Sequence, residues 1–123
     1  MRLVLAAADR DFLAAYAKWF ADRGYPAETV FDAVQLKTAL AGDGPSLCVL
    51  DERLPLLPHA DVMALLEGAG WQVITLRTER APGGAAEANT LYYPFTPREL
   101  LRAAAPWLAP TEERQATARD ENP

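Results

Sequence analysis

The chain has 123 residues, half of them hydrophobic, which is enough to bury one core and too few for two domains. Its net charge of −5 argues against nucleic-acid binding, because an acidic surface repels a phosphate backbone. The only cysteine, Cys48, lies in an apolar run, so neither an intrachain disulfide nor a metal site with several thiolates is expected. No apolar stretch reaches the ~18 residues of a membrane span and no signal-peptide pattern is present, so we expect a cytoplasmic protein that does not bind membranes.

Short apolar runs alternate with helical periods along the chain, which is the pattern of βα units around a parallel sheet. The strands are predicted at Arg2–Ala7, Ala27–Phe31, Ser46–Asp51, Gln72–Arg77 and Thr90–Tyr93. The third of these strands is continuously apolar up to its last residue, which predicts a position in the centre of the sheet.

Helices are predicted between these strands and after the last one. In the first, Asp11–Arg23, one apolar face is formed by Phe12, Leu13, Tyr16, Trp19 and Phe20. The second is capped by Asp32, and we expect Val34, Leu36 and Leu40 to face inward. The third is short, about Asp61–Glu67. The last begins at Thr96-Pro97-Arg98-Glu99, which has the sequence of a capping box with proline at the first helical position.

The stretch between the fourth and fifth strands is too short for a helix of ordinary length. Tyr93 follows Arg77 by only sixteen positions, whereas a mean helix of ~11–12 residues also needs two loops of ~2–6 residues and room for the strand. Proline and paired glycines in Glu79–Gly84 oppose a helix as well. We expect a helix reduced to about Ala85–Asn89 or lost. Residues 110–123 are predicted to be a disordered, charged tail, which leaves residues 1–109 as the domain.

Asp51 ends the central strand, at the edge where open α/β sheets bind their ligands. Two motifs accompany it: Leu50-Asp51 followed by Leu54-Pro55, and Tyr93-Pro94-Phe95 followed by Pro97, Glu99, Leu100 and Leu101. These motifs resemble the phosphoacceptor strand and the Lys-Pro-Phe segment of response-regulator receiver domains, and the resemblance covers about Arg2 to Leu108. It implies a flavodoxin-like receiver fold, a doubly wound five-stranded parallel sheet of order 2-1-3-4-5, with Asp51 at the phosphoacceptor position.

Other positions depart from the family's pattern. In a working receiver, two acidic residues after the first strand help to hold a magnesium ion, and here they are matched by Ala7 and Ala8, which supply no oxygen ligand. We therefore expect neither Mg²⁺ nor another cofactor. Asp9 lies just beyond and is more readily interpreted as a helix N-cap than as a metal ligand. The family's small hydroxyl residue is matched by Arg77, and its lysine by Tyr93.

Arg77 has two open interpretations. Its guanidinium could form an ion pair with Asp51 and fill the space of the metal and phosphoryl group, or it could point to solvent from the strand end. The resemblance also implies a cis peptide bond between Tyr93 and Pro94.

The sequence thus predicts a receiver-like signalling module, a pseudo-receiver without enzymatic activity, that acts by protein–protein interaction and independently of phosphorylation. Its partners would be other signalling proteins or a second copy of the chain. Leu56 and Leu57, which lie between prolines near Asp51, and Tyr92 on the fifth strand are candidates for the partner surface, with simple burial of the two leucines as the alternative.

Two other functions stay open. One is a response-regulator receiver that is still phosphorylated on Asp51 in a phosphorelay, with Asp9 or Glu52 in the metal shell. The other is a small flavodoxin-like ligand-binding domain, because the crevice at the sheet edge is a general site of this architecture. Against the latter, Ala6–Arg10 after the first strand is not a glycine-rich phosphate loop.

Overall fold

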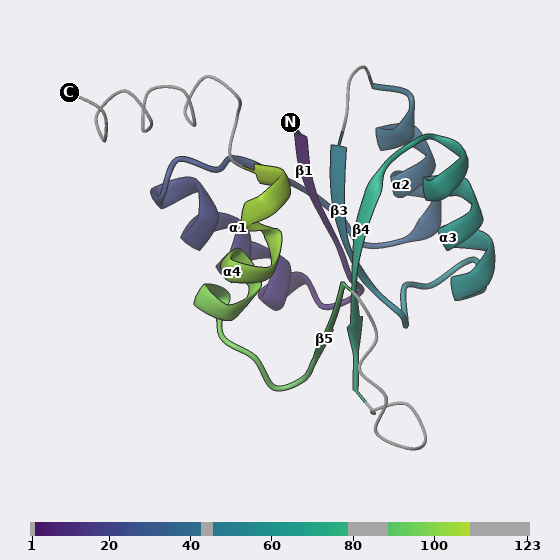
Figure 1. Ribbon diagram of the computed structural model, residues 1–123. Coiled ribbons are helices and arrows are strands. Elements are labelled where there is room, and N and C mark those ends of the chain that lie inside the picture. Colours follow the sequence, from purple (N-terminus) through teal and green to yellow (C-terminus); the bar gives the residue numbers. More distant parts are fainter. Residues whose placement is uncertain (1, 43–45, 79–88, 109–123) are drawn as a thin grey trace.

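A parallel sheet of five strands lies between two pairs of helices (Figure 1). The computed structural model describes residues 2–42, 46–78 and 89–108. The strands are β1 (Arg2–Ala6), β2 (Ala27–Val30), β3 (Ser46–Asp51), β4 (Gln72–Arg77) and β5 (Thr90–Tyr92). The helices are α1 (Arg10–Asp22), α2 (Ala33–Leu40), α3 (His59–Gly68) and α4 (Pro97–Leu108). The order β2-β1-β3-β4-β5 confirms the predicted topology. The predicted reduction or loss of a helix before β5 concerns residues 79–88 and the predicted tail residues 110–123, and both segments lie outside the described residues.

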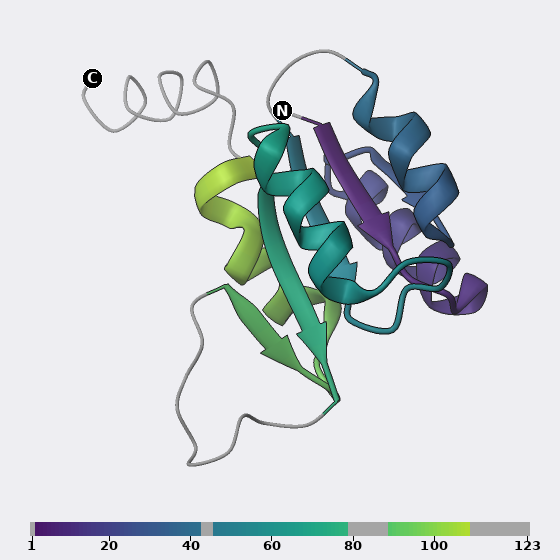
Figure 2. The same ribbon diagram turned by 90° about the vertical axis from the view of Figure 1, so that its right-hand side faces the viewer.

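The two helix pairs cover opposite faces of the sheet. Figure 1 and Figure 2 show α1 and α4 on one face and α2 and α3 on the other. All residues of β3 are buried, as predicted for the central strand, and they alternate between the two faces. Leu47 and Val49 pack in the cluster under α1 and α4, while Cys48 and Leu50 pack under α2 and α3. Burial raises the pKa of the Cys48 thiol to about 12, so this cysteine is an inert core residue.

Helix α1 has a capping side chain before its first residue and a glycine after its end. The Oδ1 atom of Asp9 accepts hydrogen bonds from the backbone N–H groups of Asp11 and Phe12, at 3.0 and 3.1 Å. Gly24 follows the helix with a φ of +88°, a left-handed conformation that glycine adopts without strain. The predicted apolar face is confirmed, with Phe20 fully buried against the sheet. This orientation brings Phe12 to the carboxyl edge of the strands.

The connection from β5 to α4 is tied to α1. The Tyr93–Pro94 peptide bond is cis, as the resemblance implied. The Tyr16 hydroxyl donates a hydrogen bond of 3.0 Å to the carbonyl oxygen of Phe95. This bond joins the loop after β5 to the helix after β1, so that Tyr93 is held beside the ends of the other strands.

The predicted capping box at the start of α4 is confirmed. The Thr96 hydroxyl oxygen accepts a hydrogen bond from the backbone N–H of Glu99 at 3.1 Å, and the Glu99 carboxylate accepts one from the backbone N–H of Thr96 at 3.2 Å. Leu100, Ala104 and Leu108 are buried, and the helix continues past Pro106.

Two expectations about helices are corrected. Helix α3 is ten residues long, because it starts at His59, directly after Pro58, rather than at Asp61. Val34 does not face inward: its relative exposure is 60%, because helical spacing places Ala33 and Leu36 on the buried face and a residue two positions before Leu36 lies on another face. Within residues 2–42, 46–78 and 89–108, none of the helices has the length and apolar character to cross a membrane.

Two apolar residues of α2, Leu36 and Val34, give a direct test of which face of the helix is buried. Leu36→Ala should lower the free energy of unfolding by about 2–5 kcal/mol, because it removes a fully buried side chain and leaves a cavity. Val34→Ala, the matched control on the exposed face, should change it by less than about 0.5 kcal/mol. Urea unfolding followed by circular dichroism measures both, and equal losses would contradict the observed face of α2.

Candidate functional site

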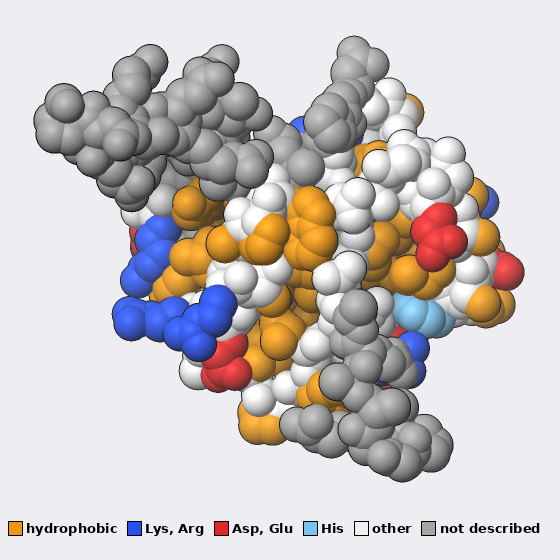
Figure 3. Space-filling model, in the orientation of Figure 1, with side chains coloured by type: hydrophobic (Ala, Val, Ile, Leu, Met, Phe, Trp, Pro, Cys, Tyr) orange, Lys and Arg blue, Asp and Glu red, His pale blue; other side chains and the backbone are white. Residues whose placement is uncertain are grey.

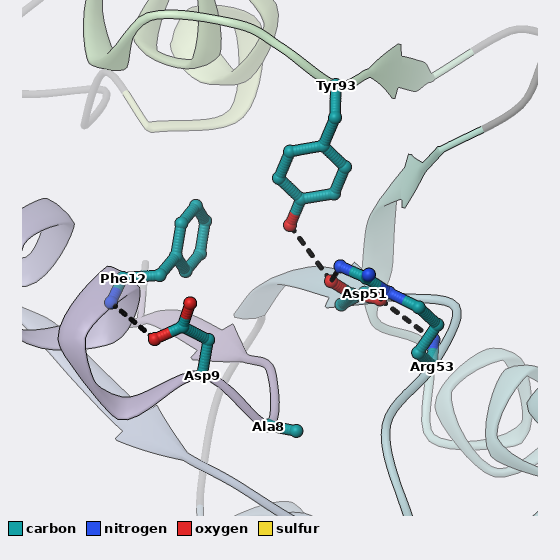
Figure 4. Close-up of a pocket in the computed structure, with 6 residues that line it drawn as sticks. All are labelled: Ala8, Asp9, Phe12, Asp51, Arg53 and Tyr93. Atoms are coloured by element: carbon teal, nitrogen blue, oxygen red, sulfur yellow. Dashed lines mark hydrogen bonds and ion pairs between the residues drawn. The ribbon is translucent and has the colours of Figure 1, made fainter.

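The carboxyl ends of β1, β3 and β5 meet around a hollow of about 390 Å³ (Figure 4). Its lining consists of Ala8, Asp9, Phe12, Asp51, Arg53 and Tyr93. Asp51 lies at its floor as the last residue of β3 and is only 4% exposed. A carboxylate this deeply buried requires partners for its charge, because desolvation of an unpaired anion is strongly unfavourable.

Arg53 supplies the main partner of the Asp51 carboxylate. Its Nε donates to Oδ1 at 3.0 Å and its Nη2 donates to Oδ2 at 2.9 Å, which is the forked geometry of a bidentate arginine–carboxylate pair. The backbone N–H of Arg53 also donates to Oδ1, at 2.8 Å. The chain therefore turns back on Asp51 directly after β3, and this turn carries the guanidinium over the carboxylate.

Tyr93 completes the shell of Asp51 from the other side of the hollow. Its hydroxyl donates a hydrogen bond of 2.9 Å to Oδ2 (Figure 4). Its backbone N–H donates to the carbonyl oxygen of Arg77 at 2.8 Å, which continues the pairing of β5 with β4 by one residue. The Arg53 guanidinium carbon lies 5.4 Å from the centre of the Tyr93 ring. At the position where the resemblance places a lysine, this chain thus presents a neutral hydrogen-bond donor.

Electrostatics fix the charge states of these three side chains. Burial raises the pKa of Asp51, but the hydrogen bonds from Arg53 and from the Tyr93 hydroxyl outweigh it and lower the pKa overall. Burial, and the hydrogen bond to Asp51, raise the pKa of the Tyr93 phenol, while the bond to Asp51 raises the pKa of Arg53. At neutral pH the site therefore holds an aspartate anion, an arginine cation and a protonated tyrosine.

Arg77 takes neither of the two predicted positions. Its Nε lies 3.7 Å from Oε2 of Glu52, and its side chain is 30% exposed, so it neither pairs with Asp51 nor extends freely into solvent. Glu52 is held beside the end of β4 because its backbone N–H donates to the carbonyl oxygen of Leu76 at 3.1 Å. Asp51 does form an ion pair, but with Arg53 of the loop after β3 and not with Arg77.

The residues after β1 offer few side-chain oxygen ligands to a metal ion. Ala7 is buried in the core, and its backbone N–H donates to the carbonyl oxygen of Val30 at 3.1 Å. Ala8 lines the hollow with a methyl group. Asp9 caps α1, as interpreted from the sequence, and also lines the hollow. Among the residues that the structure describes, no group of three or more His, Cys, Asp or Glu side chains is placed to hold a metal ion.

The residues considered for a partner surface differ in exposure. Leu56 is 65% exposed and has a φ of +84°, which is unfavourable for a leucine. Leu57 is half-buried against the core under α2 and α3. Tyr92 is half-buried on the edge strand β5. Of these three residues, only Leu56 presents its side chain mainly to solvent.

Sequence reasoning missed the roles of Arg53 and Phe12. Arg53 follows Asp51 by two residues, and an aspartate commonly accepts a hydrogen bond from the backbone two residues further on. That local turn was the available signal. Phe12 was predicted only as a core residue. Its role in the lining of the hollow depends on how α1 packs against the loop after β5, which is a tertiary contact.

Known structures show the same fold. No protein-family model matches this chain, and no curated protein sequence is significantly similar to it. The beryllofluoride-activated NtrC4 receiver domain superposes with a TM-score of 0.73 at 15% identity, over 87% of this chain and 95% of that one. The receiver domain of an HD-domain protein from Pseudomonas fluorescens gives 0.71 at 20% identity, over 97% and 91%. CheY4 of Vibrio cholerae gives 0.67 at 20% identity, over 86% and 98%. The chain therefore has the fold of a response-regulator receiver domain.

Removal of the Arg53 guanidinium should destabilise the protein. Arg53→Ala should lower the free energy of unfolding by about 1–3 kcal/mol, because it leaves the buried Asp51 carboxylate with an incomplete shell. Lys18→Ala is the matched control: it also removes the cation of an aspartate pair, but the Asp22 side chain of that pair is 58% exposed, and the loss should stay below about 0.5 kcal/mol. Urea unfolding at neutral pH would contradict the account if the two variants lost the same stability.

The lowered pKa of Asp51 makes stability depend on pH in a defined direction. Unfolding returns this carboxyl to its ordinary pKa of about 3.9. Its contribution to the free energy of unfolding is therefore fully present above that pH and is lost as the pH falls through the lower pKa of the native state. Between about pH 5 and pH 2, wild type should lose more stability than Asp51→Asn. Asp22→Asn, which removes an exposed carboxylate, should follow wild type closely. Identical slopes for wild type and Asp51→Asn would refute the lowered pKa.

Proposed function

We propose that this protein is a receiver-like signalling module that acts through contacts with other proteins and does not accept a phosphoryl group on Asp51. The observation that carries the proposal is the engagement of both carboxylate oxygens by Arg53, with Tyr93 on Oδ2 as well. An acyl phosphate forms only when one of these oxygens attacks phosphorus. Arg53 would first have to leave a charge-assisted, bidentate pair whose carboxylate is buried.

The donor set around Asp51 does not suit magnesium, which is the second support. Mg²⁺ requires near-octahedral oxygen coordination and is usually held by carboxylates together with phosphate and water. Ala7 and Ala8 offer no side-chain oxygen, Oδ1 of Asp9 is used to cap α1, and the Asp51 oxygens face a guanidinium. We infer that the module works without a metal cofactor and without enzymatic activity.

Protein contacts are the mode of action that the surface favours. Figure 3 shows hydrophobic side chains gathered over α4 and the strands beside it. Leu56 adds an exposed apolar side chain on the loop after β3. The NtrC4 receiver domain is described as a dimer, so a second copy of this chain is one candidate partner and another signalling protein is the other. The contacts would take place in the cytoplasm.

The alternative is a receiver that is still phosphorylated on Asp51. It is favoured by Asp9, which lines the same hollow as Asp51 and could turn one oxygen toward a metal. Phosphorylation would then require displacement of Arg53 from the carboxylate. The two functions differ in a single measurable reaction.

Incubation with acetyl phosphate and Mg²⁺, followed by intact-mass analysis, distinguishes them. We expect no gain of a phosphoryl group in wild type, because the attacking oxygens are paired and the metal shell is incomplete. A working receiver domain treated in parallel shows that the reagent is active, and Asp51→Asn identifies any unspecific labelling. A gain of one phosphoryl group in wild type that is absent in Asp51→Asn would overturn the proposal.

A further inference from the structure

The hollow contains two pairs of a carboxylate and an aromatic ring, and only one of them holds a cation. Asp51 and Tyr93 form the inner pair, which is occupied by the Arg53 guanidinium. Asp9 and Phe12 form the outer pair, on the opposite side of the same hollow (Figure 4). The outer pair lacks the hydroxyl hydrogen bond that Tyr93 gives to Asp51, and none of the ion pairs of the described residues places a cation there.

The Asp9 carboxylate is only partly engaged. Oδ1 accepts the two hydrogen bonds that cap α1, whereas Oδ2 accepts none within the described parts of the chain. Figure 4 shows this second oxygen on the side of Asp9 that faces the Phe12 ring. No arginine or lysine among the described residues forms an ion pair with Asp9. Because Arg53 neutralises Asp51, the charge of Asp9 remains as the net charge of the hollow.

Phe12 is held as a fixed wall beside this carboxylate. Its ring stacks on Tyr16 with centroids 4.3 Å apart, and it meets the edges of Tyr93 and Phe95 at 6.1 and 6.2 Å. A cation is attracted to the face of such a ring. The same arrangement occurs within the chain, where the Arg10 guanidinium carbon lies 4.0 Å from the centre of the Phe31 ring.

We propose that the Asp9–Phe12 end of the hollow binds the guanidinium of an arginine side chain presented by a partner protein. A guanidinium is flat, stacks on aromatic rings and forks toward carboxylates, whereas an ammonium is a compact, strongly hydrated charge. Asp9 and Ala8 are exposed, so a side chain can reach them from solvent. The inference rests on the proposed function, because it gives the chemistry of the partner's contact.

Titration with N-acetyl-arginine amide, followed by ¹H–¹⁵N NMR, tests the site on the whole chain. We expect weak, saturable shifts centred on the amides of Ala8, Asp9 and Phe12. Asp9→Asn should weaken binding roughly two- to fivefold, as expected for loss of an exposed ion pair. Asparagine caps helices as well as aspartate does, so α1 should be unchanged. Asp22→Asn removes the same charge at the other end of α1 and should bind like wild type.

Two further probes define the recognised group. N-acetyl-citrulline amide, a neutral analogue of similar shape, and N-acetyl-lysine amide should both bind more weakly than the arginine probe. Absence of localised shifts, binding undiminished in Asp9→Asn, or equal binding of the lysine probe would overturn the proposal. Phosphoryl transfer to Asp51 in the acetyl phosphate experiment would defeat the proposed function but not guanidinium binding, so the two failures are distinguishable.

Discussion

A buried carboxylate that needs partners for its charge dominates the carboxyl edge of this sheet. Asp51 is 4% exposed at the end of the central strand, and such a charge persists only if hydrogen bonds and an opposite charge surround it. Arg53 provides the charge and two side-chain hydrogen bonds, and Tyr93 provides a third. At the position that the sequence resemblance matches to the phosphoacceptor of receiver domains, the carboxylate is paired with the protein's own side chains.

This requirement connects parts of the chain that are far apart in sequence. The turn after β3 places Arg53 over Asp51, and the bond from Tyr16 to Phe95 fixes the loop that carries Tyr93. The Phe12 ring packs against Tyr93 and closes the side of the hollow. The Asp51 site is thus connected to the packing of α1 against the β5–α4 loop through Tyr93.

The sequence predicted the sheet well because its evidence is local and periodic. Continuous apolar character identified β3, spacing identified the inner face of α1, and cap residues identified the starts of α1 and α4. The sequence did not identify the cation of Asp51, because Arg53 and Arg77 both lie near the same edge of the sheet. A two-residue turn decides between them, and apolar periodicity contains no information about it. Val34 was misplaced although the start of α2 was predicted correctly, because residues two positions apart on a helix, such as Val34 and Leu36, do not share a face.

A double-mutant cycle between Asp51 and Arg53 tests the central claim most directly. The free energies of unfolding of wild type, Asp51→Asn, Arg53→Ala and the double variant would be measured by urea denaturation at neutral pH. A coupling free energy of more than about 1 kcal/mol is expected, because the two side chains stabilise each other in a buried setting. Additive effects of the two substitutions would contradict the account and would mean that Asp51 is not held by Arg53.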